Sequence, residues 1–204
     1  MFDSTLLTLV AITDDLRDGR DGLVTRAQAA VRGGATMVQV RLKDADARTL
    51  VEVARALVSA LPVPVIVNDR VDVALAAGAA GVHVGADDLP VAAVRRLAPA
   101  EFIVGASVGC DAEVAGSRGA DYVGIGPVYG TTSKLDAGQA IGVPEFVRLA
   151  RACARPAVAI GGITPDRVTP LIAAGASGVA VIRAVFSAAD PERAARAMRL
   201  ASET

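Results

Sequence analysis

The chain has 204 residues, of which 52% are hydrophobic and only 3% are aromatic, and its formal net charge is −1. A charge so close to zero argues against a nucleic-acid surface and against a polybasic membrane patch, because both need a concentrated positive field. No run of about 18 residues is free of charges and strong turn formers, so we expect no membrane span. The length suits one domain with a single core, spanning residues 1–204.

The start of the chain and its two cysteines indicate the cellular compartment. Residues 1–15 lack the basic start and the small-residue cleavage site of a secretory signal. Cys110 and Cys153 are too few for a disulfide framework and lack metal-ligand spacing. We therefore expect a cytoplasmic protein that binds neither nucleic acid nor membrane. The sequence leaves open whether it forms a homo-oligomer.

Short runs rich in Val, Ile and Ala recur along the whole chain, and a helical pattern follows each of them. The eight runs are LLTLVAIT (6–13), TMVQVRL (36–42), PVIVN (64–68), AGVHVG (80–85), FIVGAS (102–107), DYVGIGPV (121–128), AVAIGG (157–162) and GVAVIRA (178–184). Helical stretches such as residues 46–61 and 164–175 lie between them. Near-continuous apolar runs are typical of strands buried on both faces, and strand–helix alternation implies parallel pairing.

Eight strand–helix units in about 200 residues predict an α/β protein with the (β/α)8 barrel fold. An open doubly wound sheet fits the alternation almost as well, since periodicity alone cannot separate the two. The first run is not followed by Gly-x-Gly-x-x-Gly, which favours the barrel. In a barrel the reacting groups lie at the carboxyl ends of the strands, and in this chain conspicuous polar residues do follow the apolar runs.

The second run alternates polar and apolar side chains. Gln39, Arg41 and Lys43 alternate with valines and a leucine, so the two sets lie on opposite faces of a strand. With the apolar set packed on helices, the polar set points into the mouth of the barrel, where two cations and an amide suit a phosphorylated ligand. The alternative is an amphipathic edge strand with a solvated polar face.

Carboxylates follow the third and fourth runs. Asp69 and Asp88 come from consecutive parallel strands, which lie roughly 5 Å apart, and such close like charges repel unless a cation lies between them. One interpretation is a Mg²⁺ site completed by waters and phosphate oxygens. The other is helix capping, since both residues precede helical patterns, and the residues alone leave the two open. For Asp87 we favour capping.

His83 is the only histidine in the chain, flanked by valines inside the fourth run. We expect it to be a hydrogen-bonded interior residue rather than a catalyst. Ser107 in VGASVG resembles a nucleophile, but we find no residue in the sequence to serve as its base. A Ser-His-Asp or histidine-rich metal site is therefore not expected.

The connection at 124–143 is long and rich in Gly, Ser and Thr. Its hydroxyls and backbone N–H groups could wrap a phosphate, with Lys134 supplying charge, and its length suggests a closing lid. The alternative is a solvated loop without a ligand. Residues 159–164 and 179–184 end the last two strands, where many barrels bind phosphate, although paired glycines also serve tight turns.

Several of these motifs, in this order, resemble thiamine-phosphate synthase almost from end to end. They are VQVRLK, VNDRVDVAL, GVHVGADDLP, GASVG, YVGIGPVYGTTSK and AIGGIT. The resemblance implies a (β/α)8 barrel that joins hydroxymethylpyrimidine diphosphate to thiazole phosphate and releases pyrophosphate with the help of Mg²⁺. It favours the barrel over the open sheet and the metal site over capping for the Asp pair.

The resemblance also implies roles for individual positions. The pyrimidine diphosphate would contact Gln39, Val40, Arg41, Leu42, Lys43, Asn68, Ser107 and Lys134. The thiazole phosphate would contact Thr131, Thr132, Ser133, Gly162, Ile182 and Arg183. Asp69 and Asp88 would bind Mg²⁺. Arg41, Lys43, Lys134 and Ser107 would be the catalytic residues, the three cations with Mg²⁺ stabilising the departing pyrophosphate.

Two rival functions stay open at this point. A thiazole tautomerase of the same fold carries a His after the Gly of its sixth strand, where this chain has Pro127. A non-catalytic phosphate-binding barrel would not need both acids, all three cations and the loop, which this chain retains. Arg183 departs from the Ser that is common in the family, and its role is not determined by the sequence.

Overall fold

The computed structural model describes residues 2–131 and 138–203, and its eight strands close into a parallel barrel in chain order. The strands are β1 (Leu9–Ile12), β2 (Met37–Val40), β3 (Val65–Asn68), β4 (Gly81–Val84), β5 (Ile103–Val108), β6 (Tyr122–Ile125), β7 (Ala157–Ile160) and β8 (Gly178–Val181). Strand β8 returns to β1, with Leu9 opposite Val179. The predicted (β/α)8 barrel is confirmed, and the open sheet is excluded because no strand of this sheet lies at an edge.

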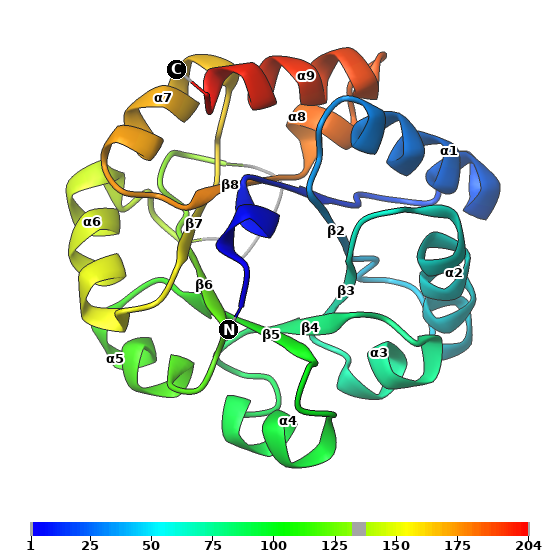
Figure 1. The fold of residues 1–204 in the computed structure, drawn as a ribbon, viewed down its shortest axis with the longest axis horizontal. Helices are drawn as coiled ribbons and strands as arrows, with labels where there is room; N and C mark the ends of the chain where they lie inside the picture. Colours follow the sequence, from blue (N-terminus) through cyan, green and yellow to red (C-terminus); the bar gives the residue numbers. More distant parts are fainter. Residues whose placement is uncertain (1, 132–137, 204) are drawn as a thin grey trace.

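Helices surround the barrel as an outer ring (Figure 1). They are α1 (Gly19–Arg32), α2 (Ala47–Ala60), α3 (Val71–Ala77), α4 (Val91–Leu97), α5 (Asp111–Val114), α6 (Gly142–Cys153), α7 (Pro165–Ala173), α8 (Arg183–Phe186) and α9 (Pro191–Ala201). Side chains fix where some of them begin: Asp46 accepts a hydrogen bond from the Thr49 N–H at 2.8 Å, and Asp190 accepts one from the Arg193 N–H at 2.9 Å. Over the described ranges no helix is both long and apolar enough to cross a bilayer.

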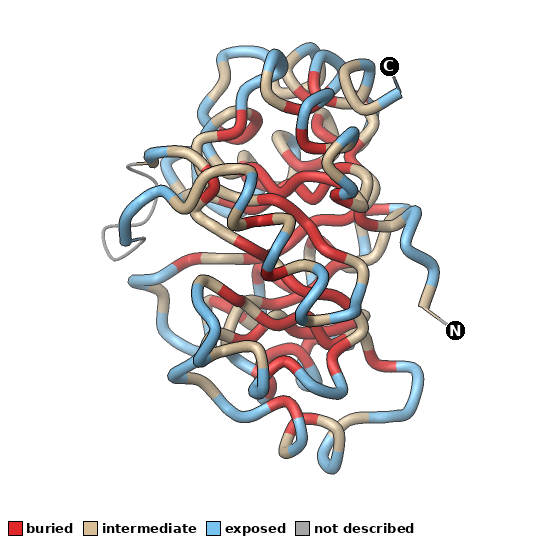
Figure 2. The backbone as a smooth tube through the Cα atoms, turned by 90° about the vertical axis from the view of Figure 1, so that its left-hand side faces the viewer, coloured by how far each residue is buried: buried red, intermediate tan, exposed pale blue. Residues whose placement is uncertain are grey.

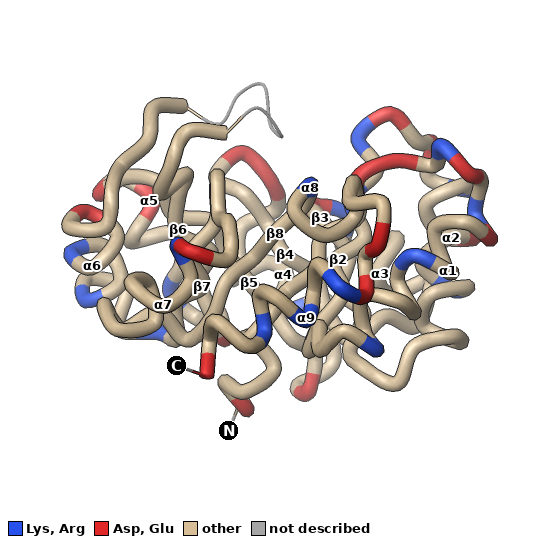
Figure 3. The backbone as a smooth tube through the Cα atoms, turned by 90° about the horizontal axis from the view of Figure 1, so that it is seen from above, with Lys and Arg blue, Asp and Glu red and all other residues tan. Residues whose placement is uncertain are grey.

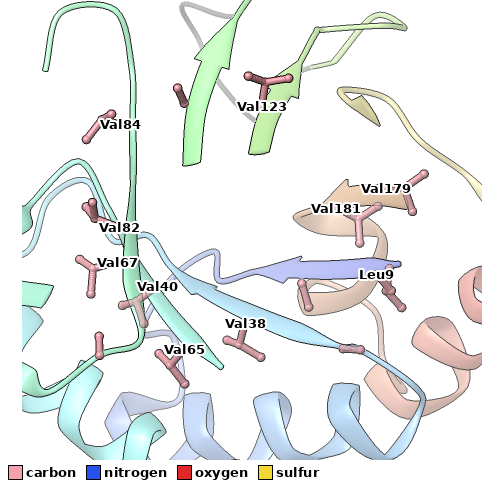
Figure 4. Close-up of a cluster of buried hydrophobic side chains, with 14 of the residues drawn as sticks. Leu9, Val38, Val40, Val65, Val67, Val82, Val84, Val123, Val179 and Val181 are labelled. Atoms are coloured by element: carbon pink, nitrogen blue, oxygen red, sulfur yellow. The ribbon is translucent and has the colours of Figure 1, made fainter. Parts of the chain in front are cut away.

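The apolar side chains form two layers. The larger layer lies between the sheet and the helices, and Figure 4 shows Val38 and Val65 from β2 and β3 directed toward the helices. The smaller layer fills the inside of the barrel and includes Val10, Met37 and Ile66. Figure 2 shows the buried strands running through the middle of the molecule, with exposed positions on the outer helices and loops. Alternation along each strand therefore decides which residues reach the interior.

The amino-terminal segment closes the bottom of the barrel. Residues 6–13 were expected to form one strand, but residues 4–7 form the 3-10 helix η1 and only Leu9–Ile12 pair in the sheet. The cause is local: Asp3 accepts hydrogen bonds from the N–H and the hydroxyl of Thr5, at 3.0 and 2.7 Å. Phe2 packs on the interior layer and stacks on the Tyr122 ring at 6.0 Å between centroids. The dark blue segment over the barrel centre in Figure 1 is this closure.

Candidate functional site

The described residues that were singled out from the sequence lie at or near the carboxyl ends of the strands. Figure 3 views the barrel from the side, with the amino terminus below and the start of α8, which follows β8, above. Several stretches of Asp and Glu lie along the upper side, and Lys and Arg positions lie beside them. This rim therefore combines both signs of charge, as a site for a metal-bound anion requires.

Gln39 points into the barrel, as the alternation predicts. It is 4% exposed and lines a small interior cavity of about 40 Å³. The remaining lining residues are Val10, Ile12, His83, Ser107, Tyr122, Gly124, Val158, Ile160 and Ala180. Val38 and Val40 are fully buried in the layer under the helices, so the alternative of an amphipathic edge strand is wrong. Its lining is mostly apolar with a few polar groups, which is the chemical character of many small-molecule sites.

Arg41 lies just past the end of β2, and its backbone is fixed by a residue that the sequence analysis missed. The Thr13 hydroxyl accepts the Arg41 N–H at 2.8 Å and donates to the Arg41 carbonyl at 3.1 Å. Thr13 itself is fully buried, and its N–H donates to the Gln39 carbonyl at 2.9 Å. Thr13 ends the first apolar run, at the strand end where site residues are expected, and this position could have identified it from the sequence.

The guanidinium of Arg41 carries a buried nitrogen for which the described residues offer no hydrogen-bond partner. Within the described ranges, Nη2 is buried and makes no hydrogen bond. A buried cationic N–H left unpaired costs about 1–3 kcal/mol or more, so such a group in a native fold calls for an explanation. A bound anion at the rim would supply the missing acceptor.

Asp69 and Asp88 both attach to the carboxyl end of β4. The Asp69 N–H donates to the His83 carbonyl at 2.7 Å, and Asp88 Oδ2 accepts the Gly85 N–H at 2.7 Å. Asp69 has a φ of 64°, a left-handed conformation that is uncommon outside glycine and found preferentially at functional sites. The two acidic residues thus bond to His83 and Gly85, the neighbours of Val84 in the chain.

The capping alternative fails for all three acids. The residues that precede α3 and α4 are Arg70 and Pro90, and neither helix has a side-chain cap. Asp87, which we expected to cap α4, is an exposed turn residue three positions before Pro90. The expectation was wrong because the chain makes a turn over residues 86–89 before α4 begins.

His83 makes the interior hydrogen bonds that were expected of it. Its Nε2 lies 3.0 Å from Ser107 Oγ, and its Nδ1 lies 3.1 Å from the Tyr122 hydroxyl. The sequence did not indicate this contact between His83 and Ser107, which arises because β4 and β5 are neighbours in the sheet. A nucleophilic triad is still not formed, since the third member is a neutral tyrosine rather than a carboxylate.

The connection after β6 is anchored on the end of β7. The Val128 and Tyr129 N–H groups donate to the carbonyls of Ile160 and Gly161, at 2.8 and 3.1 Å. A Cβ on Gly162 would lie 2.5 Å from the Gly130 carbonyl oxygen, so this position needs glycine. The described part of the connection is therefore packed and hydrogen-bonded, and is not a loose solvated loop.

Arg167 was not singled out from the sequence, yet it supports this connection. Its Nη1 donates to the Gly162 carbonyl at 2.6 Å, and its guanidinium lies over the Tyr129 ring at 4.4 Å from the centroid. Thr131 is half-buried at the end of the described segment. Three expected site residues, Thr132, Ser133 and Lys134, lie outside the described residues.

The other expected site residues also lie at the carboxyl ends. Asn68 ends β3 opposite His83 and is half-buried, and Lys43 is exposed beyond β2. Ile182 directly precedes α8, and the exposed Arg183 is the first residue of that helix. The residues that follow β2, β3 and β4 thus lie at the same end of the barrel as those that follow β7 and β8, and we call this carboxyl end the opening of the barrel.

An ion-pair cluster fixes α8 beside this opening. Arg26 Nη1 lies 2.7 Å from Asp14 Oδ1 and donates to the Phe186 carbonyl at 3.1 Å, and Arg17 donates to the same carbonyl at 3.0 Å. Asp14 also accepts the Ser187 hydroxyl at 3.0 Å. The side chains of Asp14 and Arg26 are only 10% and 12% exposed, so the pair is well shielded from solvent.

Replacing Asp14 with asparagine is expected to lower the free energy of unfolding by about 2 kcal/mol at neutral pH, because it removes charged hydrogen bonds from a shielded site. Burial alone would raise the pKa of Asp14, but hydrogen bonds from the Asp15 N–H, Arg26 and Ser187 lower it below its ordinary value. A carboxyl whose pKa is lowered in the folded state stabilises the fold at pH values above its ordinary pKa. This contribution disappears as the pH falls through the folded-state pKa.

Urea unfolding of the wild type and of Asp14→Asn at a series of pH values measures this effect. The difference between the two proteins should shrink toward acid pH. The control is Asp21→Asn, whose side chain is 89% exposed and whose effect should stay within about 0.5 kcal/mol. If the difference in unfolding free energy between the wild type and Asp14→Asn grew as the pH fell, the pKa of Asp14 would not be lowered by folding.

Known proteins resemble this chain over nearly its whole length. A family model described as thiamine monophosphate synthase matches residues 9–185. Thiamine-phosphate synthase of Xanthobacter autotrophicus is 50% identical over 200 residues, which cover 96% of this chain and 95% of that protein. Thiamine-phosphate synthase of Roseiflexus castenholzii is 47% identical over 192 residues, covering 92% of this chain and 84% of that protein.

Solved structures agree with the sequence matches. Thiamine phosphate pyrophosphorylase from Pyrococcus furiosus superposes with a TM-score of 0.87 at 36% identity, covering 98% of this chain and 97% of that one. A 3-hexulose-6-phosphate synthase superposes with a TM-score of 0.76 at 19% identity, which shows the shared barrel alone. The end-to-end matches at about half identity, together with the barrel and its charged rim, decide the family: this chain belongs to the thiamine-phosphate synthase family.

Proposed function

We propose that this chain joins hydroxymethylpyrimidine diphosphate to thiazole phosphate, forming thiamine phosphate and releasing pyrophosphate with the help of Mg²⁺. The observation that carries the proposal is the buried Nη2 of Arg41, which has no hydrogen-bond partner among the described residues and lies at the end of the barrel where Asp69 and Asp88 also follow their strands. A diphosphate offers the planar oxygen pair that a guanidinium grips, and a metal ion would link it to the acids.

The donor set fits Mg²⁺. This ion keeps several waters and uses one or two protein carboxylates together with substrate phosphates, so an acid pair suffices. In the described ranges no group of three or more His, Cys, Asp and Glu gathers as a complete protein cage, which accords with a site that phosphate oxygens complete. When bound to Asp69 and Asp88, Mg²⁺ would neutralise charge on the departing pyrophosphate.

The substrates divide between the cavity and the rim. The pyrimidine ring would enter the cavity lined by Gln39 and Ser107, with Asn68 above it, because the cavity of about 40 Å³ admits the edge of a ring but not a diphosphate. The diphosphate would stay at the rim with Arg41, Lys43 and Lys134, beside the backbone of Val40 and Leu42. The thiazole phosphate would lie across the opening, against Thr131 to Ser133, Gly162, Ile182 and Arg183.

The residues then suit a dissociative substitution. The C–O bond to the diphosphate breaks with its electron pair going to the pyrophosphate, and the thiazole nitrogen donates its lone pair to the pyrimidine methylene carbon. The cations at the rim stabilise the first step, each worth roughly 4 kcal/mol at about 4 Å and an effective dielectric near 20. No side chain has to remove a proton, and the connection after β6 would exclude water from the carbocation.

The test is an assay of pyrophosphate and thiamine phosphate with both substrates and Mg²⁺, and with each component left out in turn. We expect both products in equal amounts, and only in the complete mixture. Turnover of the thiazole phosphate alone, without Mg²⁺, would identify an isomerase of the tautomerase type. Binding of either substrate without release of pyrophosphate would identify a non-catalytic barrel.

A further inference from the structure

A chain of three polar side chains crosses the interior layer under the proposed pyrimidine site. The Tyr122 hydroxyl contacts His83 Nδ1 at 3.1 Å, and His83 Nε2 contacts Ser107 Oγ at 3.0 Å. The three residues come from β6, β4 and β5, and all three line the cavity. We call this Tyr122–His83–Ser107 chain the relay.

Two glycines make room for the relay. Gly105 pairs with both His83 and Tyr122 in the sheet, and a Cβ there would lie 2.5 Å from His83 Nδ1 and 2.5 Å from the Tyr122 hydroxyl oxygen. A Cβ on Gly124 would lie 3.1 Å from His83 Cε1. Any other residue at position 105 would occupy the space of the hydrogen bond itself. The slot is therefore shaped for this one arrangement of the imidazole and the phenol.

The burial of Tyr122 sets the direction of the hydrogen bonds. The side chain is 2% exposed, and burial, with the nearby charge of Asp121, raises the pKa of its hydroxyl well above the usual range. Over the described residues, His83 Nδ1 is the hydrogen-bond partner of this hydroxyl. If Nδ1 carried a proton, the buried phenolic hydrogen would lack an acceptor, which is unfavourable in an apolar layer.

The phenol therefore donates to Nδ1, and in a neutral imidazole the proton then resides on Nε2. Nε2–H donates to Ser107 Oγ, so the serine hydroxyl hydrogen is directed away from the histidine and into the cavity. We propose that His83 is a positioning residue: held by Tyr122, it makes Ser107 a hydrogen-bond donor to a bare ring nitrogen of the ligand. The identity of the ligand as an aminopyrimidine rests on the proposed function, whereas the proton arrangement does not.

The proton arrangement can be measured directly because His83 is the only histidine in the chain. In protein labelled with ¹⁵N-histidine and free of substrate, two-bond ¹⁵N–¹H spectra should show a neutral ring with the proton on Nε2. In Tyr122→Phe the donor to Nδ1 is lost, and the spectra should show the Nδ1-protonated form appearing. A protonated Nδ1 in the wild type, in a neutral or a cationic ring, would overturn the proposal.

A matched control separates the hydroxyl of Tyr122 from the packing of its ring. Phe2→Leu removes the aromatic ring that stacks on Tyr122 and leaves the phenol in place. We expect the Nε2-protonated form to persist in this variant. If Phe2→Leu shifts the proton to Nδ1 as Tyr122→Phe does, ring packing sets the arrangement and the proposal fails.

Kinetics test whether the relay acts through the serine. Tyr122→Phe should lower kcat/KM for the pyrimidine diphosphate by roughly 5- to 10-fold and leave KM for the thiazole phosphate unchanged. In a Ser107→Ala background, Tyr122→Phe should change kcat/KM by no more than about twofold, because the group it orients is already absent. An equal loss in both backgrounds would show that Tyr122 acts only as a core residue, against the proposal.

The two proposals fail in different ways. Absence of thiamine phosphate formation, with the proton on Nε2, would remove the proposed reaction and leave the relay in place. Full activity with the proton on Nδ1 would leave the proposed reaction in place and remove the proposed role of the relay. The NMR measurement needs no substrate, so the arrangement of the relay is decided whatever the assay gives.

Discussion

Replacing Asp69 with asparagine is expected to lower kcat by at least about a thousandfold, since it removes a carboxylate from the proposed magnesium site and with it several kcal/mol of charge stabilisation on the departing pyrophosphate. Asparagine is the suitable substitution because the residue has a φ of 64°, which asparagine tolerates better than most side chains. The fold should be retained, and the Mg²⁺ concentration for half-maximal rate should rise.

Initial rates over a range of Mg²⁺ concentrations, together with circular dichroism, measure this prediction. Asp88→Asn should behave in the same way, whereas Asp87→Asn is the matched control. Asp87 is adjacent to Asp88 in the chain but is exposed in the turn before α4, so its loss should leave the rate and the Mg²⁺ dependence unchanged. A near-normal rate in Asp69→Asn would remove this carboxylate from the proposed site.

Arg41→Ala should lower kcat by about a hundred- to a thousandfold, because Arg41 is proposed to grip the leaving diphosphate with two N–H groups in the transition state. The protein should not lose stability by a comparable amount. The substitution removes a buried Nη2 that has no acceptor among the described residues, and the unpaired group is itself unfavourable. Arg41→Lys should recover only part of the rate, since an ammonium cannot bind two oxygens in one plane.

The measurement is kcat and KM for the pyrimidine diphosphate, with urea unfolding in parallel. Arg196→Ala removes an arginine of the same charge from α9, where it makes an exposed ion pair with Glu192, and should leave both quantities nearly unchanged. Arg41→Ala could instead lower the free energy of unfolding strongly and leave the rate of the folded protein almost unchanged. Arg41 would then serve the structure at the end of β2 rather than the reaction.

Much of the fold could be predicted because the relevant signals are local. Each strand buries side chains on both faces, so each appears as an apolar run; seven runs contain the observed strands, and β5 extends one residue beyond its run. The alternation in β2 correctly separated Gln39, directed inward, from Val38 and Val40, directed toward the helices. Strand ends were less predictable: residues 6 and 7 are as apolar as a strand, but the hydrogen bonds of Asp3 fold them into η1.

The groups that support the site were missed because their partners are distant in sequence. Thr13 holds the backbone of Arg41, 28 positions away, and His83 contacts Ser107 and Tyr122 at separations of 24 and 39. Nothing near Ser107 in the sequence indicates a histidine beside it. The same holds for Arg167, whose role depends on the connection after β6 lying on the end of β7.

The sequence by itself determined the repeated strand–helix units, the chemical kinds of side chain at the strand ends and the motifs of the family, because all three depend on residue order over short distances. Only the tertiary structure decided that the sheet closes between β1 and β8, that the acids do not cap helices, and which atoms of His83 and Arg41 have partners. Closure and hydrogen-bond partnership depend on the register between strands, and register is fixed by packing across the whole barrel.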